Sequence, residues 1–183
     1  GFVELQLQRS VDGSSLAEER ILFASPPILL GRGDECLLTL ADPGVSRQHA
    51  RIQHAATQGF VLTDLGSKNG TFLDGVRLME GASLPLRQEG ELGIGQHVRL
   101  QFLRDEEQEA LSLRVKAGTR RGLRLRCAPG PFWLGGGLRL GFELGRPILH
   151  NSDGELKLDG QRVPSGVQLI RGDVLQAGSL RIE

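Results

Sequence analysis

Short segments in which apolar and polar residues alternate recur along the chain, and turn-forming residues separate them. Val3–Leu7 alternates at every position, which is the period of a half-buried strand. No stretch shows a convincing helical period, and residues 10–19 are expected to form a polar loop. The pattern predicts an antiparallel β-sandwich, with about eleven short strands before residue 105. Further strands are predicted at Ile21–Phe23, Ile28–Leu30, Leu37–Leu40, Ala50–Gln53, Phe60–Thr63, Thr71–Leu73, Val76–Leu78, Glu91–Ile94 and Val98–Leu103.

The stretch Leu62–Gly75 is predicted to organise this sandwich as a short strand, a tight polar turn and a second short strand. Asn69-Gly70 is a strong hairpin signal, because both central positions of the favoured two-residue turn need a positive φ. A hairpin here would place Ser67, Lys68 and Asn69 at the tip of a sheet.

A charged stretch, Arg104–Glu109, interrupts the strand pattern and is expected to be a linker or one turn of helix. We place a domain boundary at residues 105–110, between a first domain at 1–104 and a second, smaller all-β domain at 111–183. The second half repeats the order of short strands and glycine turns seen in the first half, which indicates a weak internal repeat. The matching segments are Phe132–Gly137 with Ile28–Gly33, Leu158–Arg162 with Leu73–Arg77, and Gly172–Val174 with Gly90–Leu92.

The balance of 22 basic and 22 acidic residues gives no reason to expect nucleic acid as a partner. Cys36 and Cys127 are too few for a disulfide scaffold and are expected to be reduced thiols. No apolar run approaches the ~18 residues of a membrane span, and no secretory signal is visible. We therefore expect a cytoplasmic protein, or the cytosolic part of a larger one. No cofactor or metal is expected, because the cysteines and histidines show no ligand spacing.

Three predicted turns carry the candidate chemistry. Arg32 follows Gly31, and a guanidinium can bind a phosphate face through two parallel hydrogen bonds. The Ser46 hydroxyl can donate to a phosphate oxygen, whereas His49 is expected to brace its loop through backbone contacts. The Asn69 carboxamide has donors and an acceptor, so it can hold the main chain of an extended peptide.

Plainer interpretations also exist: Arg32 as a surface arginine at a strand end, Arg47 as a solvated arginine, and Asn69 as part of a simple hairpin turn. A hydrolase that uses Ser46 and His49 is a further alternative. Against it, the Gly-x-Ser-x-Gly motif is missing, and nothing identifies an acidic orienting residue or an oxyanion hole.

In order and spacing, these motifs resemble the forkhead-associated (FHA) domain family over about residues 2–104. The residues that carry the resemblance are Gly31-Arg32, Ser46-Arg47-Gln48-His49 and Gly66-Ser67-Lys68-Asn69-Gly70-Thr71. The resemblance implies an eleven-stranded sandwich that binds phosphothreonine peptides through loops at one end. It also implies three groups of roles: Arg32 and Ser46 hold the phosphate with help from Ser67 and Lys68, Asn69 and Arg47 hold the peptide, and Gly31, His49 and Gly70 are architectural.

The second half departs from this pattern. Gly136 stands in place of Arg32, no Ser-x-x-His occurs between Gly137 and His150, and Asp153-Gly154 replaces Asn69-Gly70. We therefore expect the second domain not to bind phosphothreonine, but to pack on the first domain or to bind another protein.

Residues 112–146 contain eight basic residues against one acidic residue, Glu143. In Leu123–Cys127 the arginines alternate with apolar residues, which is typical of a strand with one solvated face. A basic face for an acidic partner is the alternative.

Together, these observations predict a non-enzymatic reader of threonine-phosphorylated proteins or peptides, with a Ser/Thr kinase or its substrate as a candidate partner. The competing hypothesis is a structural adaptor, in which an FHA-type fold makes phosphate-independent contacts in a secretion or division assembly.

Overall fold

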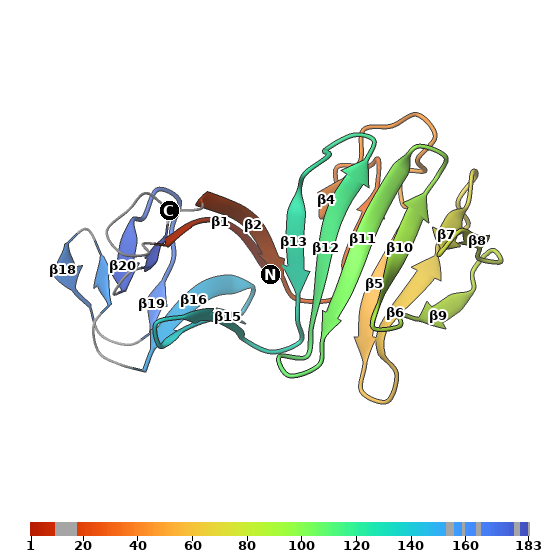
Figure 1. The fold of residues 1–183 in the computed structure, drawn as a ribbon. Helices are drawn as coiled ribbons and strands as arrows, with labels where there is room; N and C mark the ends of the chain where they lie inside the picture. Colours follow the sequence, from red (N-terminus) through yellow and green to blue (C-terminus); the bar gives the residue numbers. More distant parts are fainter. Residues whose placement is uncertain (10–17, 153–155, 159, 164–165, 178–179, 183) are drawn as a thin grey trace. The chain divides into compact units, whose positions relative to one another are not determined.

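The computed structural model describes residues 1–9, 18–152, 156–158, 160–163, 166–177 and 180–182. These residues form strands and turns without a helix, so the predicted all-β class is confirmed. Accordingly, the described residues include no helix that could cross a membrane. The chain divides into two compact units (Figure 1). The central unit is residues 26–129, and the terminal unit combines residues 1–25 with residues 130–183.

The central unit is a sandwich of two sheets whose inner faces carry the apolar residues. One sheet has the order β4 (Leu38–Thr39), β3 (Ile28–Gly31), β5 (Ala50–Ala55), β6 (Gly59–Asp64) and β9 (Ser83–Pro85). The other has the order β13 (Arg124–Cys127), β12 (Ala110–Ala117), β11 (Val98–Asp105), β10 (Glu89–Ile94), β7 (Thr71–Leu73) and β8 (Val76–Arg77). Only β3 and β4 pair in parallel among the described strands of this unit. Apolar side chains from both sheets, such as Leu30, Leu62 and Leu100, are fully buried.

The terminal unit also has two sheets. One has the order β18 (Gln161–Arg162), β17 (Lys157–Leu158), β20 (Leu175–Ala177), β21 (Leu180–Ile182), β1 (Phe2–Arg9) and β2 (Glu18–Ala24). The other has the order β14 (Phe132–Gly135), β15 (Leu138–Glu143), β16 (Arg146–Asn151) and β19 (Val167–Gln168). Its core includes Phe23 and Phe132, whose rings meet edge to face at 5.0 Å between centroids.

The six-stranded arrangement is the same in both units. The order β8-β7-β10-β11-β12-β13 of the central unit matches β18-β17-β20-β21-β1-β2 of the terminal unit. In each unit, the last two strands form a hairpin that comes from the other half of the sequence. The N-terminal hairpin of β1 and β2 completes the terminal unit, and the hairpin of β12 and β13 completes the central unit.

This division differs from the boundary predicted at residues 105–110. Those residues join β11 to β12 in a hairpin inside the central unit, and they form neither a linker nor a helical turn. The Asp105 carboxylate accepts a hydrogen bond from the Gln108 N–H (3.1 Å), and Glu109 takes a positive φ of 49°. Both features favour a tight reversal of the chain, in which Glu106, Glu107 and Glu109 are exposed to solvent.

The hairpin predicted around Asn69-Gly70 is also wrong. β6 pairs with β5 and β9, whereas β7 pairs with β10 and β8 in the other sheet. Residues 65–70 therefore cross from one sheet to the other. Gly70 has a φ of 91°, but Asn69 is not among the described residues with a positive φ. A turn with two consecutive positive φ angles lies instead between β7 and β8, at Asp74 (49°) and Gly75 (80°).

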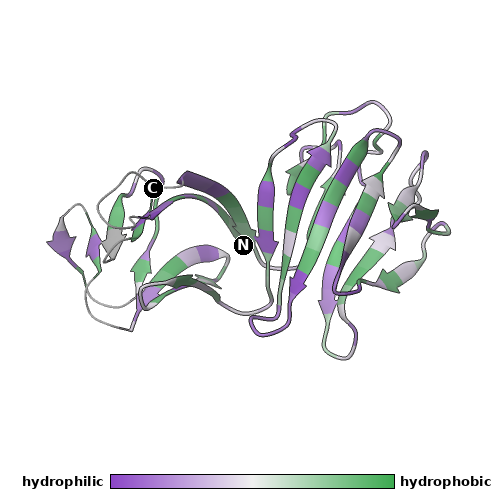
Figure 2. Ribbon diagram, in the orientation of Figure 1, coloured by the Kyte–Doolittle hydropathy of each residue, from purple (hydrophilic) through white to green (hydrophobic). Residues whose placement is uncertain are grey.

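In the basic stretch of residues 112–146, β12 and β13 have the predicted alternation of a strand with one buried and one solvated face. Leu113, Val115 and Leu125 are buried, while Arg114 and Lys116 point to the exposed side. Figure 2 shows this alternation of hydrophobic and hydrophilic positions along β11, β12 and β13.

Candidate functional site

Three chain segments meet at one end of the central unit. The turn after β3 is tied to the segment before β5 because the N–H groups of Arg32 and Gly33 donate to the carbonyls of Ser46 (2.9 Å) and Arg47 (2.9 Å). The segment between β6 and β7 joins them, since the Lys68 N–H donates to the Ser46 hydroxyl oxygen (3.1 Å). The sequence motifs therefore lie together in space.

Arg32 is held at the base of its side chain and open at the tip. Its Nε donates to the Val45 carbonyl (3.2 Å), and the residue as a whole is exposed. Gly31 is buried at the point where β3 meets the Arg47 backbone, and a Cβ there would clash with the Arg47 carbonyl oxygen and approach Cys36 Sγ. Glycine is required at this position by close approach rather than by φ.

The buried His49 ring connects the segment before β5 with the segment between β6 and β7. Its Nδ1 accepts a hydrogen bond from the Ser46 N–H (3.0 Å), so Nε2 carries the proton and donates to the Gly70 carbonyl (2.9 Å). Burial lowers the pKa of His49 below its ordinary value, which favours this neutral form. The ring thus supports the loops, as the sequence indicated, and neither nitrogen is directed to the Ser46 hydroxyl. This geometry lacks the Ser–His contact of a hydrolase.

Asp64 organises the segment between β6 and β7, and sequence reasoning missed it. Its buried carboxylate accepts from the Gly66 and Ser67 N–H groups (3.0 and 3.2 Å) and from the Ser67 and Thr71 hydroxyls (2.5 and 2.6 Å). Burial alone would raise the pKa of Asp64, but these hydrogen bonds hold it below its ordinary value. The signal was available, because an aspartate two and three residues before Gly66-Ser67 is typical of an Asx-turn.

The remaining candidate residues fall into two groups. Arg47 and Lys68 are exposed beside Ser46. Asn69 is half-buried, and its Nδ2 donates to the Gly44 carbonyl (2.9 Å), which ties two segments together. Ser67 differs from expectation, because its hydroxyl donates to Asp64 and so supports the turn.

Two more residues that the sequence did not single out hold these loops. Cys36 Sγ donates to the Arg47 carbonyl (3.1 Å), and burial raises the pKa of this thiol. The Asp42 carboxylate accepts from the Gly44 N–H (2.7 Å) and pairs with His97 Nδ1 (3.3 Å). Both cysteines are free and buried.

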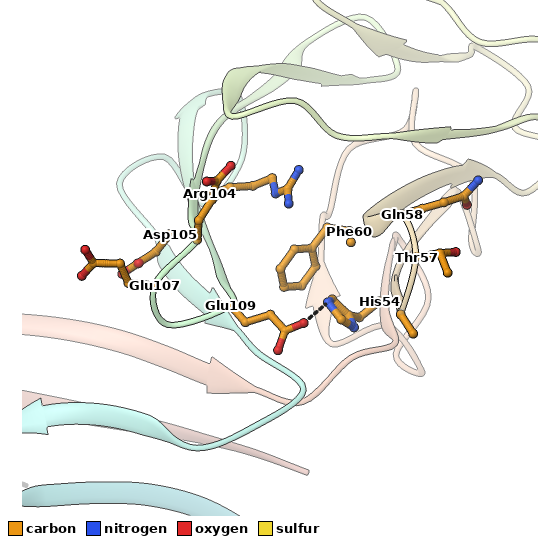
Figure 3. Close-up of a pocket in the computed structure, with 11 residues that line it drawn as sticks. His54, Thr57, Gln58, Phe60, Arg104, Asp105, Glu107 and Glu109 are labelled. Atoms are coloured by element: carbon orange, nitrogen blue, oxygen red, sulfur yellow. Dashed lines mark ion pairs between the residues drawn. The ribbon is translucent and has the colours of Figure 1, made fainter.

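The opposite end of the central unit carries an open hollow of about 600 Å³ between the β5–β6 turn and the β11–β12 turn (Figure 3). His54 Nε2 and Glu109 Oε1 lie 3.1 Å apart at its edge, and Asp105, Glu106 and Glu107 also line it. Such an acidic lining does not suit a phosphate. Within the described part of the chain, no group of His, Cys, Asp or Glu could hold a metal ion.

Between β14 and β15, where the terminal unit is fully described, there is no counterpart of the segment that carries Arg32 and Ser46. β14 passes directly into β15 through Gly136-Gly137, whereas residues 32–49 separate β3 from β5. Asn151, the last residue of β16, is opposite Leu138, the first residue of β15. Asp64 is opposite Ala50 in the same way in β6 and β5, so Asn151 occupies the position that corresponds to Asp64. Asp153-Gly154, the predicted replacement for Asn69-Gly70, lies outside the described residues.

Comparison with known proteins agrees with the motifs. Residues 28–95 match the family model of the FHA domain, which confirms the resemblance there. FhaB of Mycolicibacterium smegmatis, an FHA domain-containing protein, is 35% identical over 86 residues, which are 47% of this chain and 55% of that protein. Human kanadaptin is 37% identical over 79 residues, or 38% of this chain and 11% of that protein. The chain spans about half the length of the FhaB relatives that it matches.

Solved FHA domains align with about half of the chain. The FhaA FHA domain complexed with the intracellular domain of Rv3910 is 28% identical, covers 50% of this chain and 91% of its own, and gives a TM-score of 0.36. A structure from a study of phosphothreonine-dependent FHA domain interactions is also 28% identical, with coverages of 51% and 88% and a TM-score of 0.36.

Proposed function

We propose that the central unit binds a phosphothreonine within an extended peptide of a protein partner. The observation that carries this proposal is the convergence of Arg32, Ser46 and Asn69 on one open end of the sandwich, in a segment that matches the FHA family. The function is recognition rather than catalysis, because the histidine beside Ser46 is fully engaged with backbone groups.

Arg32 and Ser46 hold the phosphate in this proposal. With Nε bound to Val45, the two terminal nitrogens of Arg32 remain available to two phosphate oxygens. The Ser46 oxygen already accepts from Lys68, so its O–H is free to donate. A phosphothreonine carries about −1.5 to −2 charges, and each charge-assisted hydrogen bond contributes about 1.5 to 3 kcal/mol.

Lys68, Arg47 and Asn69 act on the surroundings of the phosphate. The exposed ammonium of Lys68 and the guanidinium of Arg47 add positive charge beside Ser46. One N–H of Asn69 Nδ2 is used by Gly44, so its other N–H and its carbonyl oxygen are the groups that can bond the main chain of a peptide. Ser67 assists indirectly, because it and Asp64 fix the turn that presents the Lys68 N–H.

The terminal unit is a degenerate second copy in this proposal, and it binds another protein without reading phosphate. Its strand order supports the repeat, and the direct passage from β14 to β15 removes the phosphate-binding segment. A phosphate-independent adaptor for the whole chain is the second candidate function. The terminal unit favours the adaptor function, because β14 passes into β15 without a phosphate-binding segment. The intact set of Arg32, Ser46 and Asn69 in the central unit favours phosphothreonine binding.

Binding of the full chain to a peptide library, before and after phosphatase treatment, separates these functions. We expect binding to phosphothreonine peptides, weaker binding to phosphoserine peptides and none after dephosphorylation. Equal binding before and after phosphatase treatment would instead support the adaptor.

A further inference from the structure

The turn between β12 and β13 presents two arginines without partners. Arg120 and Arg121 are exposed, and neither guanidinium group makes a hydrogen bond or ion pair with another residue that the structure describes. The turn itself is well defined, because the Gly122 N–H donates to the Val115 carbonyl (2.9 Å) and the Leu123 N–H to the Arg120 carbonyl (3.0 Å). Arg120 adopts a φ of 58°, which is uncommon for a residue with a side chain.

This turn lies at the same end of the central unit as the candidate phosphate site. A Cβ on Gly118 would lie 2.9 Å from the His97 carbonyl, so the β12–β13 turn packs against the β10–β11 turn. His97 in turn pairs with Asp42 (3.3 Å), and the Gly95 N–H donates to the Gly70 carbonyl (3.0 Å). An unbroken row of turns therefore runs from Arg120 to Asn69.

Charge is unevenly distributed along this row. On the β3–β4 side, Asp34 and Glu35 are exposed, and Glu35 accepts from Gln48 (3.2 Å). On the β12–β13 side, Arg120 and Arg121 face solvent, and the intervening Asp42 is already occupied by Gly44 and His97. A bound peptide thus meets carboxylates on one side of the phosphate and unpaired guanidinium groups on the other.

We propose that Arg120 and Arg121 form a second anion subsite, which binds a carboxylate side chain of the phosphopeptide. The proposal rests on the proposed phosphothreonine function and deepens it. Three strand spacings separate β7 from β12, or about 14 Å, which an extended peptide covers in about four or five residues. The subsite therefore selects an acidic residue at that separation, on the side of the phosphothreonine that faces the β10–β11 turn.

The hairpin that carries these arginines lies outside residues 28–95, which match the family model. The β12–β13 hairpin belongs to the central unit in space although it follows the first half in sequence. The second half of the sequence thereby contributes directly to peptide selection.

The test is a set of titrations of the full chain with phosphothreonine peptides, in which one glutamate moves from six positions before to six positions after the phosphothreonine. The variants are Arg120→Gln/Arg121→Gln and the matched control Arg87→Gln/Arg114→Gln, which removes two exposed arginines elsewhere on the same unit. Wild type and control should bind about threefold more tightly when the glutamate is about four or five positions away on one side, and added salt should reduce this gain.

The Arg120→Gln/Arg121→Gln variant should lose that gain and keep its affinity for the peptide without glutamate. Phosphothreonine binding with no positional preference, or a preference that survives in this variant, would overturn the subsite alone. Failure of every phosphopeptide to bind would overturn the subsite together with the proposed function.

Discussion

At the scale of single residues, the site depends on side chains that hold backbone rather than ligand. His49 bridges Ser46 and Gly70, Asp64 accepts four hydrogen bonds, and Gly31 permits a close backbone contact. The sequence predicted that His49 braces its loop through backbone contacts, and it predicted that Arg32 and Ser46 would lie together, because each belongs to a short motif; their binding of phosphate stays a prediction. Asp64 was missed although its Asx-turn partners, Gly66 and Ser67, follow it directly in the sequence; only its contact with Thr71 depends on how β7 is placed.

His49 makes stability depend on pH. Its pKa is lowered in the folded protein, so below about pH 6.5, the ordinary value for histidine, the unfolded chain takes up a proton that folded His49 resists. The free energy of unfolding should therefore fall as the pH drops, by at most about 1.4 kcal/mol per pH unit from this group.

Urea unfolding between pH 7.5 and 5.5 measures this effect. His49→Gln should lower stability at pH 7.5 but show a flatter pH dependence than wild type, and His150→Gln in the terminal unit is the control. Equal pH slopes for wild type and His49→Gln would contradict this role.

At the scale of elements, the strand pattern was read correctly in most places. Eleven strands occur from Phe2 to Asp105 in the described residues, and ten of them match the predicted segments, although β1 and β2 belong to the terminal unit and not to the predicted sandwich. β9 was missed, because all three of its residues are exposed and one is Pro85, so it has neither alternation nor a full set of donors. The Asn69-Gly70 signal misled for a related reason: local turn chemistry does not say whether the next strand returns to the same sheet.

The crossing segment between β6 and β7 should depend on the Asp64 carboxylate. In Asp64→Asn, one of the two oxygens becomes an NH₂ group, which leaves two of the four donors without an acceptor. We expect a loss of about 1 to 3 kcal/mol in unfolding free energy, together with weaker phosphopeptide binding.

Chemical denaturation and peptide titration of Asp64→Asn measure the two effects, with Asp74→Asn, at the exposed β7–β8 turn, as the matched control. If Asp64→Asn were as stable as wild type and bound phosphopeptide with unchanged affinity, the Asp64 hydrogen bonds would not determine the conformation of the segment between β6 and β7.

At the scale of the whole molecule, the two halves of the sequence are not the two compact units. Strand pattern and composition predicted a domain boundary at residues 105–110, which instead lie in a hairpin inside the central unit, and they could not show which hairpin completes which sheet. That choice depends on pairing between distant strands, and either hairpin has the alternating pattern of an edge partner.

This architecture predicts which fragment folds. Residues 26–129 should fold cooperatively, because they retain β12 and β13. A fragment of residues 1–104 lacks five core residues of β12 and β13, each at most 3% exposed in the full chain: Leu111, Leu113, Val115, Leu125 and Cys127. At about 1.5 to 3 kcal/mol for each large apolar side chain, this loss rivals the ~5–15 kcal/mol stability of a typical domain.

Circular dichroism, thermal unfolding and phosphopeptide binding of the two fragments provide the comparison. A 1–104 fragment that is as stable as 26–129 and binds equally well would show that the N-terminal hairpin can take the place of β12 and β13.

The most direct test of the account is calorimetric titration of one phosphothreonine peptide into the full chain and into Arg32→Ala, with Arg87→Ala as the matched control. We expect Arg32→Ala to weaken binding by at least ~10-fold, or about 1.4 kcal/mol, because it loses the guanidinium that we propose binds the phosphate. Arg87→Ala should bind like wild type, and both variants should unfold at the wild-type temperature. Unchanged affinity in Arg32→Ala would contradict the central claim and place any phosphate binding elsewhere in the molecule.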